Sequence, residues 1–188
     1  MSIAVTTRKF TVDEYHTMIQ SGILHEDDRV ELLEGEIVEM SPISSRHAAC
    51  VNNFTRLFST LNLNQKIVLA VQNPIILGSH TEPQPDVTLL KPRQDMYQSQ
   101  HPTANDIYLL IEVTETSHHI DRDRKLPLYA EAGIAEVWLV DLSQEVVERY
   151  LEPKGDAYQR IEKYVAGQEL SPQAFPDFRL AVKDILLK

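Results

Sequence analysis

The feature that most constrains the fold is an almost wholly apolar run at residues 107–113, Ile-Tyr-Leu-Leu-Ile-Glu-Val, which contains one carboxylate, Glu112. A run this short and this apolar predicts a strand at the centre of a sheet, buried on both faces. An ionised carboxylate beside such residues is costly to bury unless it is paired or binds a metal. Glu112 is therefore the first candidate for a functional residue.

Hydrophobic periodicity predicts further elements on either side of this strand. Helices are expected from about residue 11 to 20, from about 45 to 61, and from 124 to 132, the last with Asp123 as its cap. Strands are expected at 67–71, 74–77, 86–90 and 136–141, with hairpins at 30–40 and 146–165. Cys50 shares the apolar face of the second helix, so it is expected in the core rather than as a nucleophile. These elements predict a mixed sheet flanked by helices, in an α/β or α+β arrangement.

The composition is that of an ordinary soluble globular protein. The chain has 188 residues, 43% of them hydrophobic and 24% charged, which favours a single domain over residues 1–188. One cysteine excludes an intrachain disulfide, and neither a signal peptide nor a membrane-spanning run is visible, so we expect a cytoplasmic protein with no membrane partner. The net charge of −10 argues against a protein that simply coats nucleic acid, but not against an enzyme that holds divalent cations.

Three features suggest one site. Pro85-Asp86 opens a strand, Glu112 lies near the end of another, and the sequence Asp-Arg-Asp-Arg-Lys at 121–125 opens the next helix. Two carboxylates on neighbouring strand ends can hold Mg²⁺ or Mn²⁺ at one edge of the sheet, and a lysine can position water or neutralise developing charge. We therefore predict that Asp86, Glu112 and Lys125 are catalytic and that the two acidic residues bind the metal.

Two further groups complete the predicted set. Glu31 points away from the side of its apolar neighbours if its segment is a strand, so it is a further acidic candidate. The main-chain carbonyl of Val113 is a candidate metal ligand beside Glu112. Both placements are hypotheses.

The order of these motifs resembles a known family. Pro85-Asp86 followed by Glu112-Val113 resembles the signature of PD-(D/E)xK nucleases. A longer series of motifs, spanning roughly residues 10–165, resembles the Uma-type restriction endonuclease family. The matching motifs are Glu-Leu-Leu-Glu-Gly-Glu at 31–36, Met-Ser-Pro at 40–42 through His47, residues 112–117, Asp121, residues 125–130, Ala-Gly-Ile at 132–134 and residues 136–141. The resemblance implies a restriction-endonuclease-like core with helices on both sides of a mixed sheet, a divalent metal and a DNA substrate. The general signature has lysine two residues after the glutamate, where this chain has Thr114; the resemblance implies that Lys125 takes its place, as in related members.

Several of these residues have a second interpretation. Lys125 is either part of the site or a solvated residue at a helix start. Glu31 is either catalytic or a solvent-facing residue of the hairpin. His47 either lines the site as a substrate-binding residue or caps and packs its helix.

The basic and histidine residues around 118–124 are also open to two interpretations. Arg122 and Arg124 either contact DNA phosphates or pair with Asp121, Asp123 or Glu115. Adjacent residues on a strand point to opposite faces, so His118 and His119 are not expected to chelate one ion together, and no zinc site is expected there.

The favoured hypothesis is a Mg²⁺- or Mn²⁺-dependent DNA endonuclease. Water would attack the phosphorus in line and displace the 3′ oxygen, and cutting both strands would require two sites, so a two-fold homodimer is a further expectation. The first alternative is a catalytically inactive module that has kept the fold for binding a protein. The second alternative is a metal-dependent hydrolase that acts on RNA or on a small phosphodiester.

Overall fold

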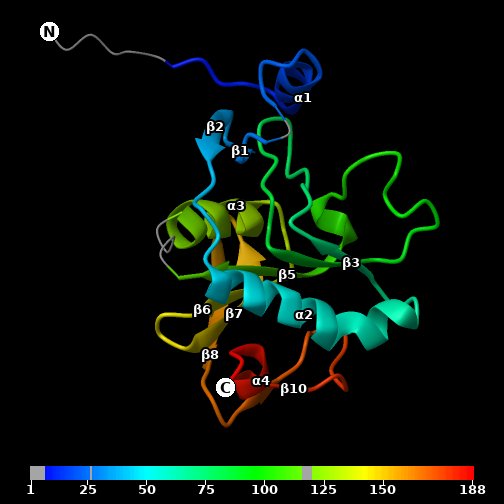
Figure 1. The fold of residues 1–188 in the computed structure, drawn as a ribbon, viewed down its shortest axis with the longest axis vertical. Helices are drawn as coiled ribbons and strands as arrows, with labels where there is room; N and C mark the ends of the chain where they lie inside the picture. Colours follow the sequence, from blue (N-terminus) through cyan, green and yellow to red (C-terminus); the bar gives the residue numbers. More distant parts are fainter. Residues whose placement is uncertain (1–6, 26, 116–119) are drawn as a thin grey trace, which may run out of the picture.

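A six-stranded mixed sheet forms the centre of the computed structural model, which describes residues 7–25, 27–115 and 120–188 (Figure 1). The strands lie in the order β3 (Val68–Val71), β4 (Val87–Leu90), β5 (Ile107–Thr114), β6 (Glu136–Asp141), β7 (Val146–Lys154) and β8 (Ala157–Tyr164). β5 and β6 are parallel, and every other neighbouring pair is antiparallel. The predicted mixed sheet is therefore confirmed, with the apolar run of residues 107–113 as an interior strand.

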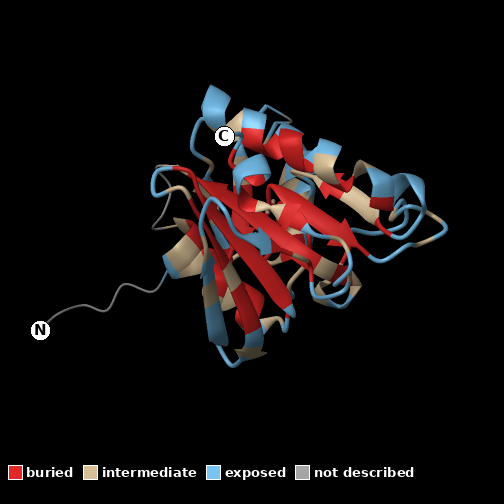
Figure 2. Ribbon diagram, turned by 90° about the horizontal axis from the view of Figure 1, so that it is seen from below, coloured by how far each residue is buried: buried red, intermediate tan, exposed pale blue. Residues whose placement is uncertain are grey.

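Helices cover both faces of this sheet. α2 (Ser45–Leu63) and the short α4 (Val182–Ile185) pack in one apolar cluster with Leu109 and Ile111 of β5, whereas α3 (Leu126–Glu131) packs in the other cluster with Leu110. This alternation is what a strand with side-chain period two produces when both faces are buried. Figure 2 shows the result, with buried strands enclosed between helical layers. The fold is α+β with a mixed sheet flanked by helices, as predicted.

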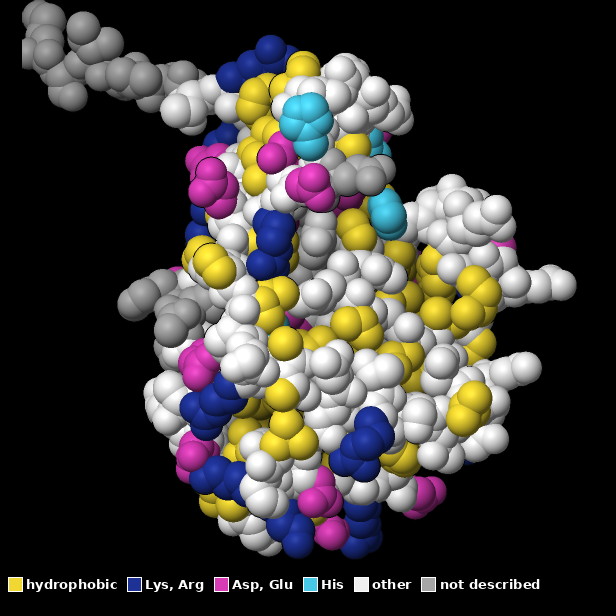
Figure 3. Space-filling model, in the orientation of Figure 1, with side chains coloured by type: hydrophobic (Ala, Val, Ile, Leu, Met, Phe, Trp, Pro, Cys, Tyr) yellow, Lys and Arg dark blue, Asp and Glu magenta, His cyan; other side chains and the backbone are white. Residues whose placement is uncertain are grey.

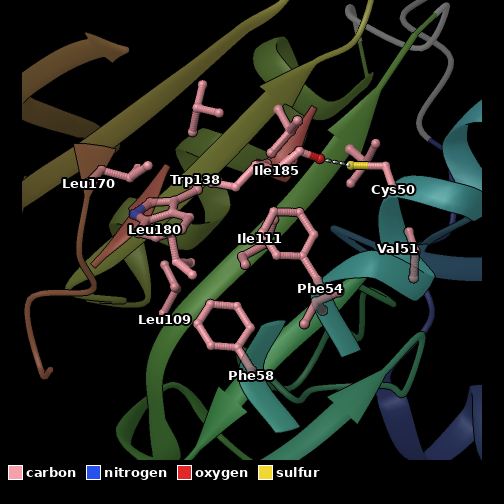
Figure 4. Packing of buried hydrophobic residues seen from close by; sticks show 14 of the residues in the cluster. Cys50, Val51, Phe54, Phe58, Leu109, Ile111, Trp138, Leu170, Leu180 and Ile185 are labelled. Atoms are coloured by element: carbon pink, nitrogen blue, oxygen red, sulfur yellow. Dashed lines mark hydrogen bonds between the residues drawn. The ribbon is translucent and has the colours of Figure 1, made fainter. Parts of the chain in front are cut away.

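The larger cluster is dominated by aromatic and branched side chains from α2 and the sheet (Figure 4). Phe54 and Phe58 stack with their ring centroids 5.9 Å apart, and both are fully buried. Trp138 of β6 is also fully buried, and its indole Nε1 donates a hydrogen bond of 2.8 Å to Glu136 Oε1. Cys50 lies in the same cluster and is 2% exposed, so the prediction of a core cysteine is confirmed.

The burial of Cys50 gives a test of this core. Burial raises the pKa of the Cys50 thiol to about 12, from an ordinary value of 9.0. A raised thiol pKa disfavours the reactive thiolate at any lower pH, so the folded protein should react with a disulfide reagent at pH 8 at least about 10³-fold more slowly than the urea-unfolded chain. Absorbance of the released thiolate measures both rates, and equal rates would contradict the packing of α2.

A smaller substructure projects from the sheet (Figure 1). It contains α1 (Val12–Gln20), which begins with the predicted capping box of Thr11 and Glu14, and the antiparallel hairpin of β1 (Val30–Leu33) and β2 (Glu36–Glu39). The hairpin turns at Glu34 and Gly35, whose φ angles of 51° and 75° are those of a type I′ turn. A Cβ on Gly35 would lie 3.0 Å or less from atoms of residues 9 and 10, so this position requires glycine twice over.

The segment at 74–77 is not a strand, contrary to the prediction. The chain leaves the sheet at Gln72, whose φ is 51°, and Ile76 forms only an isolated bridge with Thr103. Pro74 has no N–H to donate to a ladder, which removes one of the bonds that a strand there would need. The apolar residues of this segment still pack inside the protein, with Ile76 against the cluster of Leu32, and with Ile75 and Leu77 in the cluster on the α3 side of the sheet.

The predicted helix at 124–132 also begins differently. A π-helical turn (Ile120–Lys125) leads directly into α3, and Asp123 lies within that turn rather than capping the helix. Pro127 lies in the first turn of α3, where its missing N–H is tolerated. Lys125, the last residue of the π-helical turn, is buried.

The remaining elements complete the fold. A 3₁₀ turn (Ala104–Asp106) precedes β5, and the predicted closing hairpin is β7 and β8 with its turn at Gly155 and Asp156. The sequence pattern predicts no definite element after Ser171; there, β10 (Leu180–Ala181) pairs with β9 (Glu169–Leu170) before α4. Among the described residues, none of the helices combines the length and the apolar character needed to cross a lipid bilayer.

Candidate active site

Asp86 and Glu112 meet because β4 and β5 are antiparallel neighbours. Val87 lies opposite Ile111 in this ladder, which brings Asp86, one residue before β4, beside Glu112. The Asp86 N–H donates to Glu112 Oε2 at 3.3 Å, and the Val113 N–H donates to Asp86 Oδ2 at 2.9 Å. The acidic pair thus lies at one edge of the sheet, with the backbone of Val113 beside it.

Lys125 reaches this pair from the helical layer on the face of α3. Its Nζ lies 3.0 Å from Glu31 Oε2, 3.3 Å from Glu112 Oε1 and 4.0 Å from Asp121 Oδ1. The residue is only 4% exposed, so the interpretation of Lys125 as a solvated residue is wrong. The ammonium group is held in place by carboxylates from three separate segments of the chain.

Glu31 comes to the site from the projecting hairpin. β1 places Glu31 opposite Val38, and Glu31 Oε2 accepts a hydrogen bond of 3.1 Å from the Gln84 N–H in addition to its pairing with Lys125. The residue is 3% exposed, so it is not a solvent-facing residue of the hairpin. The hairpin therefore closes one wall of the site.

His47 lies in the first turn of α2 and points at Asp86. The Ser44 side chain caps the helix by accepting from the His47 N–H, while the His47 Nε2 lies 3.0 Å from Asp86 Oδ2. Burial alone would lower the pKa of the imidazole, but the hydrogen bond and charge of Asp86, with a contribution from Asp121, raise it above its ordinary value. Within the described part of the chain, the other ring nitrogen, Nδ1, is buried with no hydrogen-bond partner.

The charges of the site do not balance. Three carboxylates, those of Glu31, Glu112 and Asp121, lie within 4.0 Å of the one ammonium group, that of Lys125. A fourth, that of Asp86, lies beside Glu112 and His47. Burial, together with the charges of Asp121 and Asp86, raises the pKa of Glu112 to about 8 although Lys125 acts in the opposite direction. Burial would lower the pKa of Lys125, but the neighbouring carboxylates raise it, so the lysine is protonated. The surplus of negative oxygen donors fits a hard divalent cation.

These groups line a pocket that is open to solvent. Arg29 and Lys125 are the basic residues among its described lining residues; the others are Glu31, Glu39, Met40, Ser41, Pro42, Ile43, Ser44, His47, Gln72, Gln84, Asp86, Glu112, Val113, Glu115, Ile120 and Asp121. All the predicted catalytic and metal-binding residues, and His47, are among them. The pocket offers oxygen donors at its base and access for a substrate from outside.

Arg122 and Arg124 are not in this lining. The Arg122 guanidinium lies 2.8 Å from the buried carboxylate of Glu148 on β7, and the Arg124 guanidinium lies 3.0 Å from Glu36 on β2. Ion pairs of this kind match the second interpretation of these residues, although with different acidic partners from those expected. Their contact with DNA stays a prediction. His118 and His119 lie outside the described residues.

Three lining or supporting residues were not predicted. The Tyr129 hydroxyl donates to Glu112 Oε1 at 2.6 Å, the Gln72 side chain donates to Asp86 Oδ1 at 3.2 Å, and Arg29 lines the pocket. Tyr129 follows Lys125 by four residues, and this helical spacing could have placed both on one face. No local signal marks Gln72, whose position depends on the exit of the chain from β3.

Comparison with known proteins gives the family and the fold. The family model Uma2, described as a putative restriction endonuclease, matches residues 12–183. A crystal structure described as a putative nuclease belonging to DUF820, from Anabaena variabilis ATCC 29413, superposes with a TM-score of 0.72 at 18% identity, covering 95% of this chain and 98% of the other. No curated protein matches the chain. With its mixed sheet, its acidic pair and a family match over nearly its whole length, the chain belongs to the Uma2 family of putative restriction endonucleases.

Proposed function

We propose that this protein is a Mg²⁺- or Mn²⁺-dependent endonuclease that hydrolyses phosphodiester bonds of DNA at a PD-(D/E)xK-type site. The observation that carries the proposal is the convergence of Glu31 and Glu112 on the buried ammonium group of Lys125, with Asp86 beside Glu112, in an open pocket. Structural ion pairs also bury charge, but this site has more acidic groups than cations, and a bound divalent cation would offset the difference.

Asp86 and Glu112 would hold the metal, with the Val113 carbonyl as a further ligand. When bound, the metal would lower the pKa of a coordinated water and stabilise negative charge on the phosphate. His47 and Gln72 both contact the Asp86 carboxylate, and Tyr129 contacts that of Glu112, so these three side chains fix the orientation of the two acidic groups. Oriented ligands are what a metal site requires of its surroundings.

Lys125 acts as a donor rather than a base in this proposal. Its pKa is raised by Glu112, Glu31 and Asp121 despite burial, so it keeps its proton at neutral pH. From its position against Glu112 and Glu31 it can donate to the attacking water or to a phosphoryl oxygen as charge develops there. The water oxygen would bond to phosphorus as the bond to the 3′ oxygen breaks; the attacking water would lose one proton to solvent, and the leaving 3′ oxygen would take up one proton from solvent.

The substrate would enter through the open side of the pocket. Arg29 is exposed there and could contact a flanking phosphate, whereas Arg122 and Arg124 would contribute only if their present ion pairs exchanged with DNA. Cleavage of both strands would use two copies of the site in a two-fold homodimer.

The first test is a calorimetric titration of Mn²⁺ into the wild type, Asp86→Ala and the control Asp177→Ala. Asp177 is an exposed acidic residue far along the chain from the site. We expect Mn²⁺ binding in the wild type and in the control, and an affinity at least about 10- to 100-fold lower in Asp86→Ala. Removing a residue that only supports a metal ligand lowers metal affinity by that much, and removing a ligand itself should lower it at least as far. No binding at millimolar Mn²⁺ in the wild type would contradict the proposal and favour the inactive interaction module.

A cleavage screen then separates the substrate classes. Plasmid DNA, single-stranded DNA, RNA and a small phosphodiester are incubated with the protein and Mg²⁺ or Mn²⁺ in one buffer. Cleavage of DNA alone supports the proposal, and cleavage restricted to RNA or to the small phosphodiester would replace it with the corresponding hydrolase.

A further inference from the structure

A second group of metal-ligating side chains lies on the projecting substructure, apart from the acidic pocket. It consists of His16 on α1, Glu82 on the segment between β3 and β4, and His101 on the loop between β4 and β5. One ligand atom from each of the three lies within 4.8 Å of the other two, and His16 Nε2 is 2.7 Å from Glu82 Oε2. None of the three lines the acidic pocket.

Glu82 is the fixed member of this group. It is 3% exposed, and its backbone exchanges two hydrogen bonds with Leu32 of β1, the Glu82 N–H donating at 2.7 Å and the Leu32 N–H at 3.3 Å. A carboxylate buried to this degree needs a cationic partner or a metal. His16 provides one nitrogen beside it, and the His101 ring lies next to that of His16, with the two ring centroids 6.1 Å apart in an edge-to-face arrangement.

The two histidines are anchored to the same segment as Glu82. The Val12 N–H at the start of α1 donates to the Ser79 carbonyl at 2.8 Å, which ties the helix of His16 to the turn before Glu82. The Ile76 N–H donates to the Pro102 carbonyl at 2.8 Å, which joins Pro102, the residue after His101, to the segment at 74–77. The three donors therefore converge through backbone bonds and not through flexible side chains alone.

We propose that His16, Glu82 and His101 form a second metal site that binds Zn²⁺ or a similar transition-metal ion. Two imidazole nitrogens and one carboxylate oxygen make a donor set that suits Zn²⁺, with a fourth position left for water on the exposed side of His101. Ligand atoms around a tetrahedral zinc lie about 3.3 Å apart, so the His16–Glu82 pair, 2.7 Å apart here, would open slightly, and the three ligand atoms, which lie within 4.8 Å of one another, would close around the ion. Mg²⁺ prefers oxygen ligands, so the two sites select different ions.

A metal here would join three segments of the substructure that carries Glu31. Glu82 is bonded to Leu32, the residue next to Glu31, and Gln84 donates its N–H to Glu31 itself. The ion would therefore brace the hairpin wall of the acidic pocket from outside. In Figure 3 histidine side chains on this face lie over α1 and the adjoining loops.

The test is a Zn²⁺ titration by calorimetry, with Co²⁺ absorption as a probe of nitrogen coordination, in excess Mg²⁺. The variants are His16→Gln, His101→Gln, the control His80→Gln and Asp86→Asn, which disables the acidic pocket. His80 is an exposed histidine two residues before Glu82, bonded to Ser79. Thermal unfolding with and without Zn²⁺ measures whether the ion stabilises the fold.

We expect the wild type, His80→Gln and Asp86→Asn each to bind one Zn²⁺ with similar affinity. His16→Gln and His101→Gln should bind Zn²⁺ at least about 10- to 100-fold more weakly. Zn²⁺ should raise the melting temperature of the wild type, His80→Gln and Asp86→Asn, but not that of His16→Gln or His101→Gln. Unchanged binding in both histidine variants would overturn the proposal and leave an ordinary ion pair of His16 and Glu82. Loss of the Zn²⁺ in Asp86→Asn alone would place it in the acidic pocket instead.

Discussion

Glu112→Gln is expected to lower metal-dependent DNA cleavage by at least about 10³-fold while the fold is retained. The substitution removes the charge of one metal-binding oxygen pair but keeps the shape of the side chain. The amide oxygen of the variant can still accept from the Tyr129 hydroxyl, which donates to Glu112 Oε1 at 2.6 Å in the wild type. Plasmid nicking and linearisation measured over time give the rate, and Mn²⁺ calorimetry gives the affinity.

The matched control for this experiment is Glu131→Gln. Glu131 is an exposed acidic residue at the end of α3 and is not among the pocket residues. Its rate should stay within about twofold of the wild type. Undiminished cleavage by Glu112→Gln would remove the glutamate from the mechanism, whereas loss of cleavage together with a lost unfolding transition would show that the residue acts through folding.

The outcome for Glu112 also separates nuclease from binding module. In an inactive module the buried carboxylate would be a cost of the fold, because burial raises its pKa to about 8. Neutralising it would then raise stability and leave a partner protein bound as before. In the proposed enzyme, the same substitution removes both metal affinity and cleavage.

How far the site could be predicted from sequence differs from residue to residue. The apolar run around Glu112 predicts its strand and its burial, because only a paired or metal-binding carboxylate is tolerated there. The position of Asp86 beside it required the register of β4 on β5, which the sequence pattern alone does not give. The family resemblance supplied that pairing before the structure did.

Other features depend on contacts between distant segments. Lys125 pairs with Glu31 of the β1–β2 hairpin, which is far from it in the sequence. The local sequence does not show this contact, so it is equally compatible with a solvated lysine. The pairing of Arg122 with Glu148 joins a π-helical turn to β7 in the same way. At 74–77 the β-branched residues predict a strand, but Pro74 and Gln72, whose φ is positive, prevent one.

Lys125→Met is expected to have the largest effect on stability, about 3–5 kcal/mol, because it leaves buried carboxylates without their cation. Lys125 Nζ is within 3.3 Å of both Glu31 and Glu112, and all three residues are at most 4% exposed. Methionine keeps the volume of the side chain, so the loss would come from charge rather than from a cavity. Urea unfolding of the variant, with the exposed Lys183→Met as control, measures it.

Magnesium ions distinguish the two roles of this lysine. If the pocket binds a divalent cation, added Mg²⁺ offsets the unpaired carboxylates, so it should raise the melting temperature of Lys125→Met more than that of the wild type. Cleavage should stay at least about 10²-fold below the wild type even at saturating Mg²⁺, because the donor to the developing charge is gone. Lys125→Arg restores the charge with a different geometry, so it should restore the free energy of unfolding more fully than the cleavage rate. Wild-type stability in Lys125→Met would contradict the buried charge network, and wild-type cleavage would remove Lys125 from catalysis.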